Sequence, residues 1–405
     1  MEKRFVWPMR LAATESDRCQ CSKRENRANL PRMHLEARTT IAAAKSDRYE
    51  YLPSVPWIER LSHAVNRRFL WLLLIAYAAA AFWPQAGLWI RGVSFGELNF
   101  FGERVAFTLP LLLLALLLGN AGLAVRTECL TRLRRTPLLL FIGLAVNLIA
   151  PLALLFVMTQ VIRGCTDAIE TQALLIGLTL VVAMPVAGSS AAWAQNGGGD
   201  VSLSLGLVLG STLLSPFTTP LVLRAASHMT AGNGSAILME LAGETNAFLL
   251  AGVVVPSVLG LFGHRLLREE RIYPWRSHLG LLNAVVLLTL CYANAAVSLP
   301  HAISYPDWNY LAWVMGLVAL LCALMFASGW GLARLLKADD SQKLALMYGL
   351  GMNNNGTGLV LAGTMLASHS EVLLPLILYN LVQHLAAGCI KSAARSASSP
   401  RKNAL

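Results

Sequence analysis

The amino-acid sequence predicts an all-α polytopic membrane protein with ten transmembrane helices, arranged as two inverted five-helix repeats. Three observations favour this fold class. Hydrophobic residues make up 56% of the 405 residues and charged residues only 14%, which is unusual for a soluble domain. The apolar residues come in blocks long enough to cross a bilayer, which takes about 20 residues. The blocks of the two halves of the chain also follow one another at matching spacing.

Each predicted helix of the first half recurs roughly 170 residues later in the second half. Because five is an odd number, the second unit must enter the membrane from the opposite side, which is the pattern of inverted-topology repeats. The first repeat is expected over residues 69–223 and the second over residues 239–391. The ten helices are expected over residues 69–88, 105–125, 137–159, 171–194, 201–223, 239–264, 277–298, 309–335, 342–366 and 371–391.

Charge predicts the orientation of the chain, because Lys and Arg stay on the cytoplasmic side of membrane helices. Residues 1–68 form a basic tail, expected to be disordered or loosely helical, and residues 392–405 form a second tail. With both tails in the cytoplasm, the predicted external segments hold only four of the 33 basic residues, Arg91, Arg104, Arg163 and Arg224. Topology in a bacterial inner membrane therefore accounts for the net charge of +11, and we expect no nucleic-acid partner.

The second and third predicted helices each carry one polar feature. The second contains a small-residue patch at 119–122, which suits close helix packing. In the third, Asn147 precedes Pro151 by four residues, and a proline removes the hydrogen bond to the carbonyl four residues earlier. Asn147 is therefore either a contact between helices or a cation ligand.

The fourth and ninth predicted helices are interrupted at their centres. The fourth contains Pro185 and Gly188, followed by two serines, and the ninth contains four glycines around three consecutive asparagines, 353–355. Glycine costs a helix about 1 kcal/mol relative to alanine, and asparagine in hydrocarbon needs partners. We expect helices opened at mid-membrane, broken by Pro185, Gly188, Gly349, Gly351, Gly356 and Gly358.

Interrupted helices at corresponding positions of two halves point to the binding site of a transporter. Their half-helix N-termini would offer positive dipole ends to an anion, and their unwound carbonyls would offer oxygen ligands to a cation. Tight packing of two glycine-rich helices is the alternative, but it leaves the correspondence unexplained. The sequence therefore predicts a secondary transporter with alternating access, and not an enzyme.

At these residues the sequence resembles the bile acid/sodium symporter family. Residues 184–190, 199–204 and 211–216 resemble the family's fourth and fifth helices, and residues 351–356 resemble its ninth-helix motif Gly-Met-Gln-Asn-Ser-Gly. The resemblance implies ten helices in two inverted repeats and transport of a small organic anion together with sodium. Sodium is the expected coupling ion, and no cofactor is expected.

The resemblance also implies positions for the two cation sites. The first would use Ser190 and Ser204, with Ala191, Val208 and Gly349 standing where the family has Asn, Thr and Glu. Since the missing Glu supplies the only formal charge, a proton-coupled or uncoupled carrier of the same fold is an alternative. The second site would use Asn353, the carbonyls of Leu350 and Met352, and Asn147.

Substrate contacts are expected from five residues, Asn354, Asn355, Thr357, Asn380 and His384. An alternative is that Asn380, Gln383 and His384 form only a hydrogen-bond cluster between helices. Glu240 and Glu244 are expected to be solvated, unless they reach the cavity and replace the missing Glu. An intramembrane hydrolase using Ser190 and His384 is the alternative from another functional class.

Overall fold

The computed structural model describes residues 56–100, 102–125, 133, 137–162, 168–230, 232–367 and 369–398. This part of the chain is α-helical apart from one two-stranded hairpin. Six of its helices are long and apolar enough to cross a membrane, and a bent pair, 57–67 with 69–82, is a seventh candidate. The chain is therefore an all-α integral membrane protein, and the ten-helix inverted repeat stays a prediction.

The first half of the described chain places helices near each of the first five predicted positions. Its elements are α2 (Pro56–Arg67), α3 (Phe69–Phe82), α4 (Gln85–Gly92), β1 (Ser94–Phe100), β2 (Glu103–Thr108), α5 (Leu109–Leu123), α7 (Pro137–Ile162), α8 (Ala168–Ala183), α9 (Gly188–Gly197) and α10 (Val201–Met229).

The second half repeats this correspondence, and the C-terminal helix extends beyond its predicted end. Its elements are α11 (Asn233–Leu249), a π turn (Leu250–Val254), α12 (Val255–Ile272), η2 (Tyr273–Trp275), α13 (Arg276–Ser304), α14 (Trp308–Leu335), α15 (Asp340–Gly351), α16 (Asn355–Met365), η3 (Ser370–Val372) and α17 (Leu373–Ser398). The first 55 residues of the predicted tail and residues 399–405 lie outside the described part.

Several predicted helix boundaries are wrong, and two of these errors have a local cause. The first helix ends at Phe82 and not at residue 88, because Pro84 follows and the chain starts a new helix at Gln85. The second starts at Leu109, since residues 103–108 form strand β2, which pairs antiparallel with β1. Thr108 caps α5 through a hydrogen bond from the Leu111 N–H, which sets the start of that helix.

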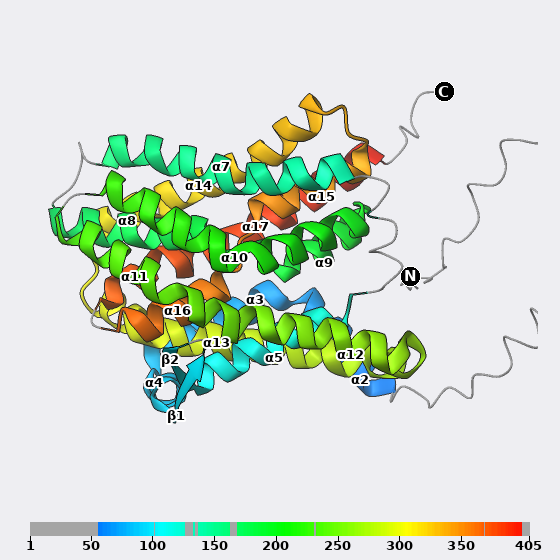
Figure 1. Cartoon of the computed structure of the whole chain (residues 1–405), viewed down its shortest axis with the longest axis horizontal. Coiled ribbons are helices and arrows are strands. Elements are labelled where there is room, and N and C mark those ends of the chain that lie inside the picture. The colour runs from blue at the N-terminus through cyan, green and yellow to red at the C-terminus, as the bar shows by residue number, and fades with distance from the viewer. Residues whose placement is uncertain are drawn as a thin grey trace, which may run out of the picture. The chain divides into compact units, whose positions relative to one another are not determined.

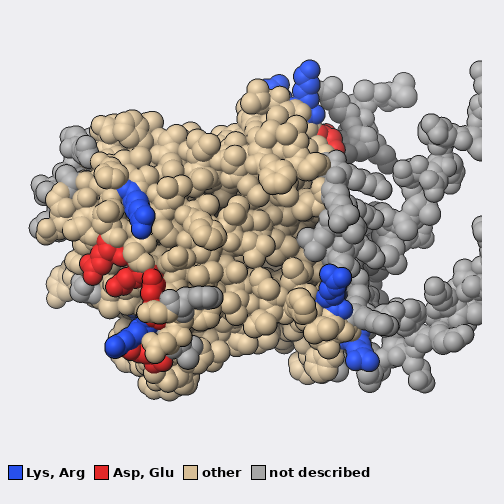
Figure 2. Space-filling view, in the orientation of Figure 1, with Lys and Arg blue, Asp and Glu red and all other residues tan. Residues whose placement is uncertain are grey.

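The helices form two layers in Figure 1. One layer contains α7, α8, α9, α10, α14, α15 and α17, and the other contains α3, α5, α12 and α13. The predicted packing patch on α5 is confirmed, because a Cβ added at Gly122 or Gly260 would overlap backbone atoms of the facing helix. On the face in Figure 2, coloured charged side chains lie toward the two ends, as expected for a membrane protein.

Candidate transport site

Both predicted helix breaks are present, and they lie against each other. The first separates α8 from α9 at residues 184–187, and the second separates α15 from α16 at residues 352–354. Val186 and Asn353 form an antiparallel β-bridge, so two extended segments from distant parts of the sequence pair at this point. We call this place the crossing. Helices α9 and α16 both begin there, so their N-termini lie at the crossing.

Hydrogen bonds across the crossing replace those that the helix breaks remove. Proline has no N–H, so Pro185 cannot donate to the Val181 carbonyl four residues earlier. The Asn353 side-chain amide donates to that carbonyl instead, at 2.8 Å. The Thr219 hydroxyl of α10 likewise donates to the Ala183 carbonyl at 2.7 Å. The first break is therefore held open by side chains from two other segments.

Backbone N–H groups on both sides of the crossing are diverted from their helical acceptors. The Val186 N–H donates to the Ser211 hydroxyl at 3.0 Å, and not to the Val182 carbonyl. The Asn354 N–H donates to the Pro185 carbonyl across the crossing at 2.8 Å, and not to the Leu350 carbonyl. Carbonyls released from helical bonding in this way are the oxygen ligands that an unwound membrane helix offers to a cation.

The predicted helix-breaking glycines lie beside the breaks and not within them. Gly349 and Gly351 are in the last turn of α15, and Gly356 and Gly358 are inside α16. Their backbones do not have positive φ values, so none is needed for a left-handed conformation. A Cβ at Gly351 would overlap the Phe326 ring of α14. Close helix contact is therefore a reason for glycine here.

Replacing Gly351 with alanine should lower the free energy of unfolding by about 1–3 kcal/mol, the usual cost of overpacking. The added Cβ cannot fit against the Phe326 ring without moving α14 or α15. Thermal unfolding in detergent measures the effect. Gly356→Ala is the matched control, because a Cβ there would meet its nearest side-chain atoms only at 3.5 Å. Equal Tm values for the two variants would contradict this packing argument.

Several polar side chains around the crossing are buried without a hydrogen-bond partner. An orphaned buried polar group costs roughly 1–3 kcal/mol, so each calls for an explanation such as a bound ion, water or ligand. Each of these residues was predicted as a site residue from the sequence. They are the Ser190 and Ser204 hydroxyls, the Thr357 hydroxyl, both polar atoms of the Asn355 amide, and Asn147 Oδ1.

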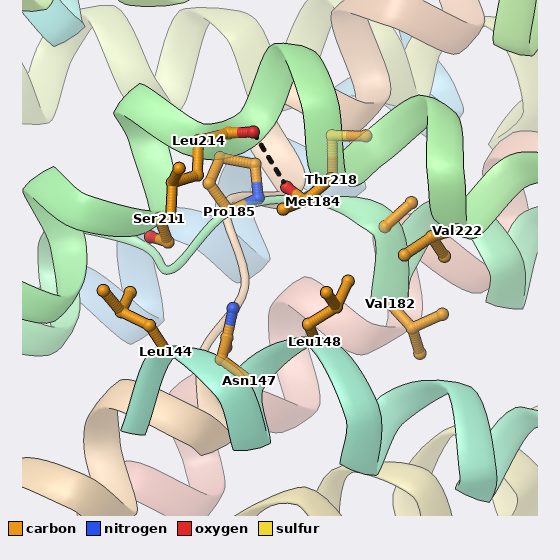
Figure 3. Close-up of a pocket in the computed structure, with 11 residues that line it drawn as sticks. Leu144, Asn147, Leu148, Val182, Met184, Pro185, Ser211, Leu214, Thr218 and Val222 are labelled. Carbon is orange, nitrogen blue, oxygen red and sulfur yellow. Dashed lines mark hydrogen bonds between the residues drawn. The ribbon is translucent and has the colours of Figure 1, made fainter. Parts of the chain in front are cut away.

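Asn147 lies in a small cavity between α7, α10 and the first break. Figure 3 shows its side chain pointing from α7 toward Pro185, with Ser211 on the opposite wall. The cavity has a volume of about 30 Å³. A water molecule needs roughly 10–15 Å³ measured in this way, so one small ion or one to two waters would fit. Of the other predicted second-site residues, Leu350 lies in the last turn of α15 and Met352 in the second break, where the Met352 carbonyl accepts from the Ala187 N–H at 2.9 Å.

Comparison with known proteins identifies the family. The sequence model of a family described as "Sodium Bile acid symporter family" matches residues 111–302, which include the first break. The chain belongs to this family. The uncharacterized protein YbaS of Bacillus subtilis (strain 168) is 28% identical over 52% of this chain, an alignment that covers 65% of YbaS itself. The uncharacterized sodium-dependent transporter YocS of the same organism is 23% identical over 75% of this chain and 84% of its own length.

In this symporter-family chain, Leu207 stands next to position 349, where the resemblance places an acidic residue. A Cβ added at Gly349 would lie 2.6 Å from Cδ1 of Leu207, which projects from α10. Leu207 is fully buried in an apolar cluster with Leu203 and Leu346. A side chain at position 349 would therefore have to displace the end of the Leu207 side chain.

Asn380 and Gln383 form the predicted interhelical cluster. Gln383 Oε1 accepts from the Asn353 N–H at 3.0 Å, and Gln383 Nε2 donates to Asn380 Oδ1 at 3.2 Å. Asn380 in turn donates to the Tyr77 hydroxyl of α3 at 3.0 Å. The network links α17 to the crossing and to the other helix layer. Asn380 therefore holds Gln383 and Tyr77 in position, and this role does not depend on a contact with substrate.

His384 is held apart from this network. The Trp193 indole N–H donates to His384 Nδ1 at 3.3 Å, so Nδ1 carries no proton, and the Phe69 ring packs against the imidazole. Ser190 has no hydrogen-bond partner, and hence the nucleophile–base pair of a hydrolase is not formed. The family is also one of transporters and not of enzymes.

The remaining predicted residues lie where the sequence placed them on their helices. Asn354 caps α16 by accepting the Thr357 N–H at 3.3 Å through Oδ1, which leaves its NH₂ end free for a ligand. Glu240 and Glu244 are exposed on α11, in keeping with the expectation that they are solvated.

Sequence reasoning missed Ser211 and Thr219 of α10, which hold the first break. With Ser215 they recur every four residues, and this spacing places them on one helix face. The four-residue spacing was visible in the sequence, but the backbone groups of the first break that these side chains bond to were not.

Proposed function

We propose that this family member is a secondary active transporter that moves a small organic anion across the membrane by alternating access, coupled to sodium. The crossing carries the proposal, because two half-helix N-termini, released carbonyls and orphaned polar side chains meet there. An ordinary packing contact between helices satisfies its polar groups within the protein. The unpaired polar groups at the crossing are therefore available to bind an ion or a substrate.

The cation would bind through neutral oxygens. Ser190 lies in the first turn of α9 and Ser204 in the first turn of α10, and both hydroxyls are buried and unpartnered. Asn353 and the carbonyls of Leu350 and Met352, with Asn147, remain the proposed second set. Alkali cations are hard and prefer such oxygen ligands. Without a carboxylate the affinity would be weaker, because only dipoles balance the charge.

The anion would bind at the start of α16. A helix N-terminus carries about half a positive charge, and its first N–H groups lack helical partners. Asn355 and Thr357 present buried, unpartnered polar atoms in this first turn, and Asn354 adds its free NH₂ end. His384 and Asn380 would complete the substrate site from α17. Unpartnered donors at the N-terminus of a helix suit an anion.

Alternating access would come from movement of the two helix layers against each other, with substrate bound between them. The layer with the crossing would be the rigid core, and the layer of α3, α5, α12 and α13 would be the moving panel. This movement requires the predicted inverted repeats. A chain of ten membrane helices would also place both of its termini on the same side, which is predicted to be the cytoplasm. A bacterial inner membrane is the proposed location.

Sodium chloride should stabilise the purified full-length chain more than potassium or choline chloride at equal concentration. A ligand that binds only the folded state raises its stability with the logarithm of concentration over Kd. In Ser190→Ala the sodium affinity should fall at least about tenfold, which corresponds to about 1.4 kcal/mol. Sodium-free stability should not fall, because the change removes an orphaned hydroxyl.

Ser215→Ala is the matched control, since its buried hydroxyl already bonds to the Thr212 carbonyl at 2.8 Å. It should keep the sodium response. Equal stabilisation by the three chlorides, or an unchanged response in Ser190→Ala, would refute the sodium sites.

A proton-coupled or uncoupled carrier of the same fold is the second candidate. It is favoured by Leu207, which stands next to position 349, where the resemblance places an acidic residue. Uptake into proteoliposomes that persists without sodium would identify it.

A further inference from the structure

A second and larger cavity lies away from the crossing, where α4 and the hairpin meet α13 and α16. Its volume is about 220 Å³. The polar groups of its wall are the guanidinium of Arg91, the amide of Asn294, the hydroxyls of Thr108 and Thr364, and the backbone of Gly363. Nothing in the family comparisons assigns a role to it.

Arg91 is the charged group of this cavity. Its Nη2 donates to the Gly363 carbonyl at 2.5 Å, and its Nη1 donates to Asn294 Oδ1 at 3.5 Å. A guanidinium has five N–H donors, so most of its hydrogen-bonding capacity remains beyond these two bonds. The ion pairs of the described part of the chain do not include Arg91. No carboxylate there balances its charge.

Capping of α16 explains only part of this arrangement. The C-terminus of a helix carries about half a negative charge, and Gly363 lies in the last turn of α16. This leaves net positive charge beside an open cavity. Burial lowers the pKa of Arg91, yet a guanidinium remains protonated in proteins. A cap alone would need neither the cavity nor the additional donors.

We infer that this cavity binds the carboxylate group of a small organic anion, held by Arg91 in a fork of N–H donors. The inference rests on the proposed function, because the anion would be the transported one, met on the predicted external side. Arginine is the preferred side chain for paired hydrogen bonds to carboxylates. Pockets for drug-sized ligands measure roughly 300–1,000 Å³, so this cavity suits a smaller molecule.

Helix α16 connects the two sites. Asn355 begins this helix at the crossing, and Gly363 lies eight residues further, or about 12 Å along the axis. A carboxylate that competes for the Arg91 guanidinium would loosen its contact with Gly363, and so act directly on the helix that forms the inner site.

The test uses the full chain in detergent without sodium. Choline salts of propionate, valerate, cyclohexanecarboxylate and benzoate are compared with the four matching carboxamides by thermal unfolding. At least one carboxylate should raise Tm where its amide does not. Arg91→Gln should weaken that affinity roughly 10- to 100-fold, the effect of losing hydrogen bonds to a charged group. Arg91→Lys should fall between, since it keeps the charge without the fork.

Arg104→Gln is the matched control, because Arg104 is a second basic residue of the predicted external side. Its side chain is 80% exposed and pairs with Glu97 at 3.8 Å. Gly363→Ala gives an independent variant, as its Cβ would lie 2.8 Å from Nη1 and displace the guanidinium while the charge remains. It should also weaken carboxylate binding.

Carboxylate stabilisation that is equal in Arg91→Gln and Arg104→Gln would overturn the inference, and so would the absence of stabilisation by all four carboxylates. Ser190-dependent sodium binding in either case would leave the proposed function standing. Conversely, Arg91-dependent carboxylate binding without any sodium effect would refute sodium coupling and retain this site.

Discussion

Asn353→Ala should abolish sodium-driven uptake into proteoliposomes and lower the free energy of unfolding by about 1–3 kcal/mol. The Asn353 amide donates to the Val181 carbonyl, which Pro185 leaves without its helical donor. In alanine the carbonyl loses this partner in a buried site, and an orphaned acceptor costs that amount. The second break, residues 352–354, would also lose the side-chain hydrogen bond that ties it to α8.

Asn246→Ala is the control for this change, because Asn246 is an exposed asparagine of α11. It should leave uptake and Tm unchanged. The backbone bond from the Asn353 N–H to Gln383 survives in Asn353→Ala, so the variant should still fold and permit both measurements. Uptake within twofold of the wild-type rate would show that backbone pairing alone maintains the crossing.

The sequence predicted the helix breaks because their causes are local. Proline lacks an N–H whatever surrounds it, and three asparagines in an apolar run need polar partners in any fold. The orphaned hydroxyls of Ser190 and Ser204 were anticipated through a family motif of fixed spacing. The small-residue patch of α5 was predictable for the same reason, since glycine permits close approach before the partner helix is known.

The partners of the crossing could not be predicted, because they come from distant parts of the chain. The amide of Asn353 and the carbonyl of Val181 are 172 residues apart, and periodicity carries no information about such a pair. Strand β2 was missed because its residues 105–107 are apolar and lead into the apolar run of α5, and only the Thr108 cap separates them. Arg91 was interpreted as a topology signal, because its cavity exists only in the folded chain.

Restoring the family's acidic residue should require two substitutions. Gly349→Glu alone should destabilise the protein by about 1–3 kcal/mol or more, because Leu207 occupies the space and the carboxylate would be buried. Leu207→Ala alone should cost about 2–5 kcal/mol through the cavity that it leaves. Together the two changes should cost less than their sum, since each relieves the defect of the other.

The double variant should bind sodium at least about tenfold more tightly than the wild-type chain, or about 1.4 kcal/mol, because a carboxylate adds a formal charge to a site of neutral oxygens. Burial raises the pKa of a carboxyl group, and protons therefore compete with sodium. Its sodium affinity should fall as pH decreases, whereas that of the wild-type site should change little. Sodium titrations of thermal stability at several pH values measure both. An unchanged sodium affinity in a folded double variant would mean that position 349 no longer faces the cation, and that Leu207 did not simply replace a lost ligand but closed the site.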